Sequence, residues 1–441
     1  MPDDPGLERR PPRSREGTST HEPGVEDATD AYVDGDRTIA PGTAGAALRH
    51  RDFRVVWTGT FASNIGTWMQ NVLLGAYGYT LTGSETFVAV LFFAQLGPLL
   101  LLSNVGGVLA DLVDRRRLLI ACQTQQLLFS VVLALLATSD QPNEAMLVLC
   151  VFAIGVGNAL GAPALNSILP TLVPRRDLAG AVALQSVQMN LSRVVGPAIG
   201  AAIYAAIGAS PVFAINAATY LFAIVSIVVV RYPSQTRGES KGVLGRLGEG
   251  FRVVSGDPLM RRVLLTLVWL SLFSLAFVGL MPVIAADNLG IAPRSFEFGA
   301  FYAIFGLGAA IGAISVGTVF ARVAKARLIR PALLAFSVLL AAFGLARTPV
   351  LAFVLAPVLG YAYFVVITSL STVLQEHVDD AVRGRVMALW IMGFGGTVPV
   401  GVLLAGPVAA ATSITTVLLV GAAVAVVLAW YADLVRVGAP S

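Results

Sequence analysis

A short charged stretch, Gly106-Gly107-Val108-Leu109-Ala110-Asp111-Leu112-Val113-Asp114-Arg115-Arg116-Arg117-Leu118-Leu119, joins two long apolar segments. The segments cover about 86–112 and 117–138. Each is long enough for a helix of the ~20 residues that cross the ~30 Å hydrocarbon core of a membrane. The pattern predicts two membrane-spanning helices that are joined by a short charged loop.

The composition of the whole chain supports a membrane protein. Of its 441 residues, 56% are hydrophobic and 13% are charged, whereas soluble domains have about 45–50% apolar and about 25% charged residues. Single hydrophobic cores stop growing at about 250–300 residues, so this excess of apolar side chains cannot be buried in one core. A soluble enzyme is therefore excluded, and we expect lipid around much of the chain.

Apolar stretches recur along the chain from Phe53 onward, separated by short breaks that are charged or rich in Pro and Gly. Membrane barrel strands would need only about 9–11 residues and would alternate polar with apolar positions, so helices are expected instead. We predict an all-α membrane protein with twelve transmembrane helices, at about 53–80, 86–112, 117–138, 145–170, 178–208, 210–230, 262–287, 296–321, 328–346, 350–375, 386–410 and 413–434.

The positions of Lys and Arg give the expected orientation. Of the 30 Lys and Arg, only Arg294 and Arg347 fall in one set of alternate loops, and Arg193 falls inside a span. Because positive charge stays on the cytoplasmic side, we expect both termini in the cytoplasm. This topology explains the net charge of +4 without nucleic acid as a partner.

The charge and polarity pattern also divides the chain. We expect a disordered cytoplasmic tail over 1–48, six-helix bundles over 49–231 and 262–435, a cytoplasmic linker over 232–261, and a short cytoplasmic tail over 436–441. Within the linker, apolar residues recur at helical spacing and suggest an amphipathic helix on the membrane surface, with a flexible linker as the alternative. These apolar residues are Val243, Leu247, Phe251 and Val254.

The two halves repeat one another at the level of single residues. Four residues of the first half match four of the second at a constant offset: Leu169, Val173, Ala183 and Leu184 with Leu374, Val378, Ala388 and Leu389. Together the matches suggest two pseudo-symmetric bundles around a central cavity. Such an arrangement binds substrate near the midplane and alternates access by rocking one half against the other.

The charged stretch closely resembles the loop motif of the major facilitator superfamily, G-x-L-a-D-r-x-G-r-[KR]-x-x-l. Leu112 stands where the family usually has Arg, and Asp114 where it has Gly. The resemblance implies that Gly107 lets two helices approach closely and that Asp111 binds the start of a neighbouring helix, contacts that break when the halves rock. A basic loop that only fixes topology is the alternative. The matching residues are Gly107, Leu109, Ala110, Asp111, Arg115, Arg116 and Leu119.

A second motif lies in the fifth span, where Gly196-Pro197-Ala198-Ile199-Gly200 is similar to the G-P-x-x-G core of an exporter motif of this superfamily. Ser192 and Ala183 stand where the longer pattern has Gly. We expect a kinked helix with a smooth face that seals on a partner helix, and an ordinary proline kink is the alternative.

Loop details narrow the resemblance to the branch of bacterial enterobactin exporters and macrolide efflux permeases, the transmembrane secretion effectors, over about 50–435. The resemblance implies proton-driven export of an amphipathic small molecule across a bacterial plasma membrane. Within transport, the alternatives are import of a metabolite and flipping of a lysolipid. A membrane sensor that transports nothing is the alternative from another class.

Arg193 is an ionisable side chain deep within a span, where burial is costly and implies a function. It can bind an anion or carbonyl group of a ligand, or it can bond to helix carbonyls. Neutral polar residues cluster in the first half and face a more apolar, aromatic second half, which suits an amphipathic ligand. From these we expect four residues in a substrate cavity: Asn64, Gln95, Gln126 and Arg193.

Proton coupling requires a carboxylate that water can reach. The candidates, Asp111, Glu85, Asp287 and Glu376, all lie at the ends of spans rather than at mid-membrane. The sequence has no catalytic triad, metal-ligand spacing or nucleotide-binding motif, so we expect no enzyme activity and no cofactor. The expected partners are a small-molecule substrate, protons and the lipid bilayer, and the chain is expected to be a monomer.

Overall fold

The computed structural model describes residues 40, 42–230, 232 and 243–435. Side chains of a few further residues inside the helices, Asp111 among them, also lie outside the described part. The described residues contain helices and no strand. The predicted tails fall mostly outside the described part, as do residues 233–242 of the predicted linker.

The first half is built from helices that begin with α2 and end with α9. Their bounds are α2 Ala44–Arg49, α3 Arg51–Thr82, α4 Glu85–Leu96, α5 Pro98–Leu112, α6 Arg115–Leu136, α7 Glu144–Ile168, the short 3-10 turns η1 Leu169–Leu172 and η2 Arg175–Asp177, α8 Leu178–Ile207 and α9 Ala209–Val229.

The second half begins with α10 and ends with α19, and three of its segments, η3, η4 and η5, are π-helical. The bounds are α10 Val243–Gly256, α11 Pro258–Trp269, η3 Leu270–Ser274, α12 Ala276–Gly279, α13 Met281–Val283, η4 Ile284–Asn288, α14 Phe296–Gly317, α15 Lys325–Leu345, α16 Pro349–His377, α17 Asp380–Ile391, η5 Met392–Gly396, α18 Thr397–Ala411 and α19 Ile414–Tyr431.

Nine helices of the described part are long and apolar enough to cross a membrane. The other three predicted spans fall on segments that depart from a plain apolar helix. Helix α3 carries several buried or half-buried polar residues, the next span is divided at Gly97 into α4 and α5, and the span over 262–287 is divided among α11, η3, α12, α13 and η4. The all-helical membrane fold is thus confirmed, and the count of twelve stays a prediction.

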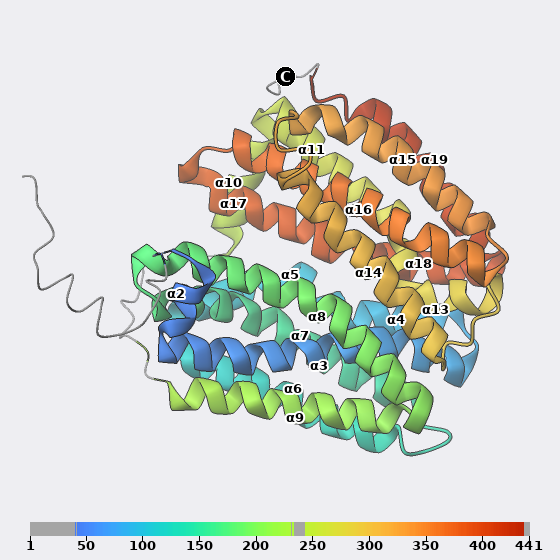
Figure 1. Cartoon of the computed structure of the whole chain (residues 1–441), viewed down its shortest axis with the longest axis horizontal. Coiled ribbons are helices and arrows are strands. Elements are labelled where there is room, and N and C mark those ends of the chain that lie inside the picture. The colour runs from blue at the N-terminus through green and yellow to red at the C-terminus, as the bar shows by residue number, and fades with distance from the viewer. Residues whose placement is uncertain (1–39, 41, 231, 233–242, 436–441) are drawn as a thin grey trace, which may run out of the picture.

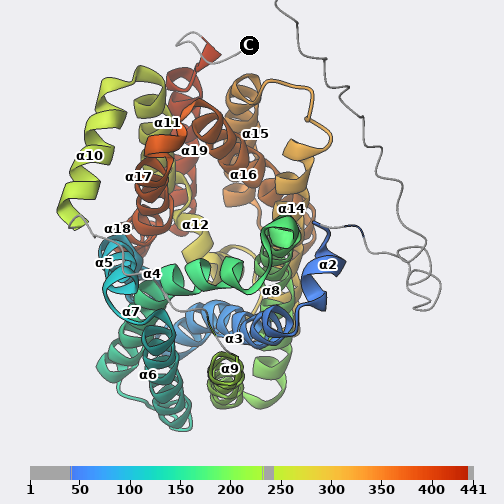
Figure 2. The same cartoon turned by 90° about the vertical axis from the view of Figure 1, so that its left-hand side faces the viewer.

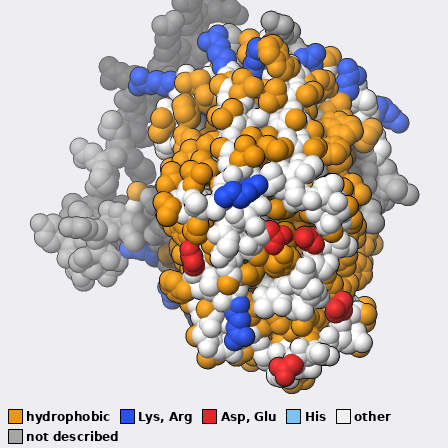
Figure 3. Space-filling model, turned by 90° about the vertical axis from the view of Figure 1, so that its right-hand side faces the viewer, with side chains coloured by type: hydrophobic (Ala, Val, Ile, Leu, Met, Phe, Trp, Pro, Cys, Tyr) orange, Lys and Arg blue, Asp and Glu red, His pale blue; other side chains and the backbone are white. Residues whose placement is uncertain are grey.

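The surface of the helices is apolar where it is exposed. Val338, Val350 and Val427 are 69%, 76% and 66% exposed on the flanks of their helices, whereas acidic and basic side chains lie among hydrophobic ones at the right-hand end of Figure 1, which faces the viewer in Figure 3. A soluble protein rarely exposes such continuous apolar surface, because water makes it costly. These side chains face hydrocarbon.

The same helix pairings recur in both halves. In the first half α5 packs on α7 and α6 on α9, and in the second half α14 packs on α16 and α15 on α19. The two halves meet along α8 with α14 and along α4 with α18, which lie on opposite sides of the molecule in Figure 2. The two halves therefore share one pattern of helix packing.

The ribbons of the two halves diverge toward the end that carries α2 and α10 (Figure 1). At the opposite end, contacts cross between the halves. The Tyr79 hydroxyl donates to Asp287 Oδ1 at 2.5 Å, and the Arg294 guanidinium lies 5.6 Å from the centre of the Tyr204 ring. A Cβ added at Gly75 would lie 3.1 Å from Pro282.

Helix α2 corrects the expected boundary of the N-terminal tail. Residues from Gly42 onward are folded, because the Gly42 N–H donates to Asp177 Oδ1 at 3.1 Å and Thr43 caps α2 by accepting from the Ala46 N–H. Ala46 and Ala47 are buried, and α2 packs on α8. Residues 42–48, which the prediction assigned to the tail, are therefore folded against the first half.

Candidate functional site

A single arginine of α8 lies between the two halves. The Arg193 guanidinium carbon is 5.1 Å from the centre of the Trp68 ring in α3 and 5.7 Å from that of Phe364 in α16. Within the described residues Arg193 has no ion pair, and its Nε is buried without a hydrogen-bond partner. A cation between two aromatic rings is favourable, by about 2 kcal/mol when desolvated, yet several N–H groups remain available to an acceptor.

The side of this site that belongs to the second half is aromatic. Tyr363 stacks on Phe305 with ring centres 6.4 Å apart, and it meets Phe364 edge to face at 4.7 Å. Tyr302 of α14 joins the cluster through Phe305 at 6.3 Å. The cluster offers Arg193 an apolar wall with few competing acceptors.

A separate polar cavity of about 140 Å³ lies within the first half, between α3, α6, α7 and α8. Asn64 and Gln126, both predicted substrate residues, line it together. Gln123 Oε1 and Gln188 Oε1 are buried and have no hydrogen-bond partner in the described part. Its polar lining residues are Thr60, Ser63, Asn64, Thr67, Gln123, Gln126, Asn158, Asn166, Gln185, Gln188 and Tyr220.

Gln95 is placed differently from the other predicted substrate residues. Its amide donates to Asn71 Oδ1 and joins α4 to α3, and it does not line the polar cavity. Gln70 likewise accepts from Ser130 Oγ at 3.3 Å and Asn216 Nδ2 at 2.8 Å. These amides hold helices together, a common use of polar side chains in membranes. The four predicted residues therefore lie in three places rather than in one cavity.

In the loop motif, arginines donate hydrogen bonds to backbone carbonyls, and one glycine packs closely against α7. Arg115 Nε donates to the Ala110 carbonyl at 3.1 Å, and Arg116 Nη2 donates to the Val228 carbonyl at the end of α9. The side chain of Asp111 lies outside the described residues. A Cβ at Gly106 would come within 2.8 Å of the Leu160 carbonyl oxygen, whereas one at Gly107 would meet nothing within 4 Å. The close approach expected at Gly107 is made instead by Gly106.

The glycines of the second motif pack against α3 in the same half. A Cβ at Gly196 would lie 2.7 Å from Trp68 Cβ, and one at Gly200 would lie 3.1 Å from Met69 Cα. Pro197 is buried inside α8. On the neighbouring face, Ala201 contacts Gly299 of α14. Helix α8 is thus closely packed both within its half and against the other half.

The candidate proton carriers lie at helix ends. Glu85 stands in the first turn of α4, Asp287 is exposed in η4, and Glu376 is exposed one residue before the end of α16. Asp287 binds Tyr79 across the halves. Protonation of this carboxylate would remove a charged partner from a contact that holds the two halves together.

Two His–Asp pairs, which the sequence did not suggest, lie at the ends of the spanning helices. His50 Nε2 is 2.8 Å from Asp177 Oδ2, and His377 Nε2 is 2.9 Å from Asp257 Oδ2. Partial burial raises the pKa of Asp257, but hydrogen bonds from the Met260 N–H and His377 outweigh it and hold the pKa below its usual range. In the first half the pair ties the start of α3 to η2, and in the second half it ties the start of α11 to the end of α16.

The aromatic partners of Arg193 were also missed as individual residues. Trp68 and Phe364 are far apart in the sequence, and no local pattern distinguishes them from other lipid-facing or core aromatics. The sequence feature that came closest to predicting them was the more apolar and aromatic character of the second half. Among the described residues no cluster of His, Cys, Asp and Glu could hold a metal ion.

Residues 42–439 match the family model described as transmembrane secretion effector. The chain belongs to the transmembrane secretion effector family. It is 28% identical over 344 residues to the enterobactin exporter EntS of Shigella boydii serotype 4, a match that covers 77% of this chain and 81% of that protein. EntS of Escherichia coli O1:K1 is also 28% identical over 344 residues, with the same coverage.

Solved structures show the same fold. A point mutant of the nucleoside transporter NupG superposes with a TM-score of 0.73 at 14% identity, and the match covers 88% of this chain and all of that one. A bacterial homologue of the human lysosomal transporter Spinster, inward-facing and unoccupied, gives 0.71 at 15% identity, over 88% and 98% of the two chains. The protein is therefore a membrane transporter of the major facilitator fold, with exporters among its relatives.

Proposed function

We propose that this chain exports an amphipathic small molecule, drug-like, macrolide-like or siderophore-like, by proton-coupled alternating access. The observation that carries the proposal is Arg193, a cation between the halves with two aromatic neighbours and no carboxylate partner in the described part. Exporter relatives support the direction. We include in the proposal an N-terminal bundle at 49–231, on which residues 42–48 also pack, a C-terminal bundle at 262–435 and both termini in the cytoplasm.

The proposed substrate has an acceptor group for Arg193 and a ring or chain for the aromatic wall. A charge-assisted hydrogen bond contributes about 1.5–3 kcal/mol, and the half-buried ring of Phe364, which packs on the buried ring of Tyr363, stacks with a ring of the substrate in this proposal. The polar cavity between α3, α6, α7 and α8 supplies further hydrogen-bond donors and acceptors for the substrate. Asn64 and Gln126 contact polar groups of the substrate in this proposal, while Gln95 acts through the packing of α3 on α4.

Proton coupling is proposed through a carboxylate at a helix end. Asp287 is the candidate with a contact that a proton would alter, because its carboxylate accepts from Tyr79 across the halves. Glu85, Glu376 and Asp111 are the others. Gly196, Pro197 and Gly200 hold α8 closely against α3, so we propose that α8 and α3 move together when the halves rock. Arg115 and Arg116 bond to carbonyls of α5 and α9, so we propose that the loop of the first motif moves with these helices.

The test uses proteoliposomes that contain the purified chain. An imposed pH gradient should drive movement of an amphipathic compound that is anionic at neutral pH more strongly than movement of a cationic one of similar size. Arg193→Gln should lower the apparent affinity for the anionic compound by about 10–100-fold, the loss of one charge-assisted hydrogen bond. Arg193→Lys should retain part of the transport.

Arg347→Gln is the matched control, because Arg347 lies outside the spans and binds the Gly344 and Ala346 carbonyls at one end of α15. Equal transport by Arg193→Gln and the wild type would refute the site. Substrate movement that ignores the pH gradient would refute proton coupling and leave uniport or another ion.

A further inference from the structure

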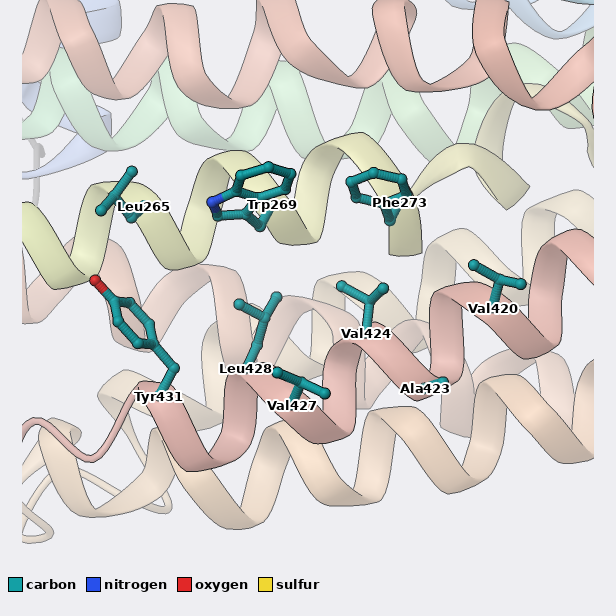
Figure 4. Close-up of a pocket in the computed structure, with 9 residues that line it drawn as sticks. All are labelled: Leu265, Trp269, Phe273, Val420, Ala423, Val424, Val427, Leu428 and Tyr431. Atoms are coloured by element: carbon teal, nitrogen blue, oxygen red, sulfur yellow. The ribbon is translucent and has the colours of Figure 1, made fainter.

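A long apolar groove of about 630 Å³ lies on the outer surface of the second half (Figure 4). One wall is α11 with η3, and the other is α19. The rings of Trp269 and Phe273 stack at 5.7 Å and 12° and form a flat aromatic wall. The lining residues are Leu265, Trp269, Phe273, Val420, Ala423, Val424, Val427, Leu428 and Tyr431.

The groove faces the hydrocarbon of the membrane. Trp269 is 47% exposed, and neither wall carries a charged side chain between Leu265 and Phe273 or between Val420 and Tyr431. From Val420 to Tyr431 the groove is about 16 Å long at ~1.5 Å per residue. One leaflet is half of a ~30 Å hydrocarbon core, or about 15 Å. The groove therefore has the length of one leaflet.

A cation stands at one end of the groove. Arg262 precedes Leu265 by one helical turn and lies on the same face of α11 as Trp269. Its guanidinium carbon is 5.3 Å from the centre of the Tyr431 ring, and its Nη1 donates to the Tyr431 carbonyl at 3.3 Å. Within the described residues no carboxylate pairs with Arg262, so its remaining N–H groups are available to an anion.

The neighbouring charges leave this site positive. The carboxylate of Asp433 is 3.7 Å from Arg330, whose guanidinium lies 4.5 Å from the centre of the Trp430 ring. Trp and Tyr side chains prefer the level of the lipid headgroups. Trp430 and Tyr431 thus mark the headgroup level at the end of α19, where Arg262 also lies.

We propose that this groove binds one acyl chain of an anionic glycerophospholipid, whose phosphate is bound by Arg262. The aromatic wall and the valines of α19 contact the chain over one leaflet, and Arg262 selects the charge of the headgroup. Basic pockets between transmembrane helices bind anionic headgroups in this way. The site lies on the surface of one half, away from Arg193 and from the contacts between the halves.

Native mass spectrometry of the purified full chain tests the site with an equimolar mixture of phosphatidylglycerol and phosphatidylcholine of identical acyl chains. The wild type should retain phosphatidylglycerol about fivefold over phosphatidylcholine, the ratio for one arginine at a membrane surface. Arg262→Gln should reduce the ratio to about one. Arg261→Gln should keep it, because Arg261 is the adjacent exposed arginine and donates to the Ser255 carbonyl.

A second pair of variants tests the groove itself. Ala423→Phe fills the groove, so it should reduce retention of both lipids, whereas Val426→Phe adds the same ring to a part of α19 that does not line it. Inorganic phosphate should not displace the bound lipid, because the acyl chain supplies part of the affinity.

Three results would overturn the proposal. Arg262→Gln could keep the wild-type preference, or Ala423→Phe and Val426→Phe could retain equal lipid. A dimer mass that Ala423→Phe alone removes, with lipid retention unchanged, would assign the groove to a second copy of the chain.

Discussion

Two adjacent glycines of α5 should respond oppositely to the same substitution. A Cβ at Gly106 would lie 2.8 Å from the Leu160 carbonyl oxygen and 2.9 Å from that of Ala159, both backbone atoms of α7. Such contacts force a shift that costs about 1–3 kcal/mol. At Gly107 the Cβ would meet nothing within 4 Å, so Gly107→Ala should gain up to about 1 kcal/mol of helix propensity.

Thermal unfolding of the two purified variants in the same detergent measures this difference. Both variants gain the same propensity, so they should differ by about the steric cost of 1–3 kcal/mol. At about 1 °C per kcal/mol for a chain of 441 residues, Gly106→Ala should unfold about 1–3 °C below Gly107→Ala. An equal change of unfolding temperature in both variants would refute the close packing of Gly106 in α5 on the backbone of α7.

Transport by the same two variants separates packing from movement. Gly107→Ala should leave the fold intact, so any loss of transport by this variant assigns Gly107 to a close contact in another state of the cycle. Transport and unfolding temperature both unchanged in Gly107→Ala would remove Gly107 from the gating residues.

Four other substitutions test a helix cap, two amides and the contact between the halves. Asp257→Ala removes the cap of α11 and should cost about 1 kcal/mol at pH 7. A carboxylate with a lowered pKa stabilises the fold above its ordinary pKa of about 3.9 and loses this as the pH falls through its folded-state value, so variant and wild type should converge only below about pH 4. Gln95→Ala should lower the unfolding temperature without changing substrate preference, whereas Asn64→Ala should change the preference and not the stability; the reverse pattern would contradict the placement of these residues. Asp287→Asn removes a charged acceptor and should increase opening at the end opposite α2 and α10, measured as slower disulfide trapping of cysteine pairs introduced across the halves; unchanged trapping would remove Asp287 from the contact.

The site shows where local sequence stops being informative. Arg193 could be singled out because an arginine in an apolar span is costly wherever it lies. Its neighbours could not, since Trp68 and Phe364 are brought to it by α3 and α16 from opposite halves. Gln95 and Asn64 also look alike in the sequence, yet one bonds to Asn71 and the other lines a cavity. The rotation of each helix about its own axis decides which of the two side chains faces the cavity.

The loop motif makes the same point for glycine. The resemblance assigned the close approach to Gly107, because a motif records which residue type recurs and not which neighbour it meets. The crossing of α5 and α7 places Gly106 against the Leu160 backbone instead.

The sequence by itself determined that lipid surrounds much of the chain and that the fold is an all-helical membrane fold. Apolar segments of membrane length, few charges and the two motifs suffice for this, because transfer of apolar side chains into lipid is a property of composition and period. The tertiary structure decided which side chains meet: the pairing of α8 with α14 and α4 with α18, the aromatic neighbours of Arg193, and the groove beside Arg262. These depend on the rotation and crossing of helices, which are set by packing between segments that are distant in the sequence.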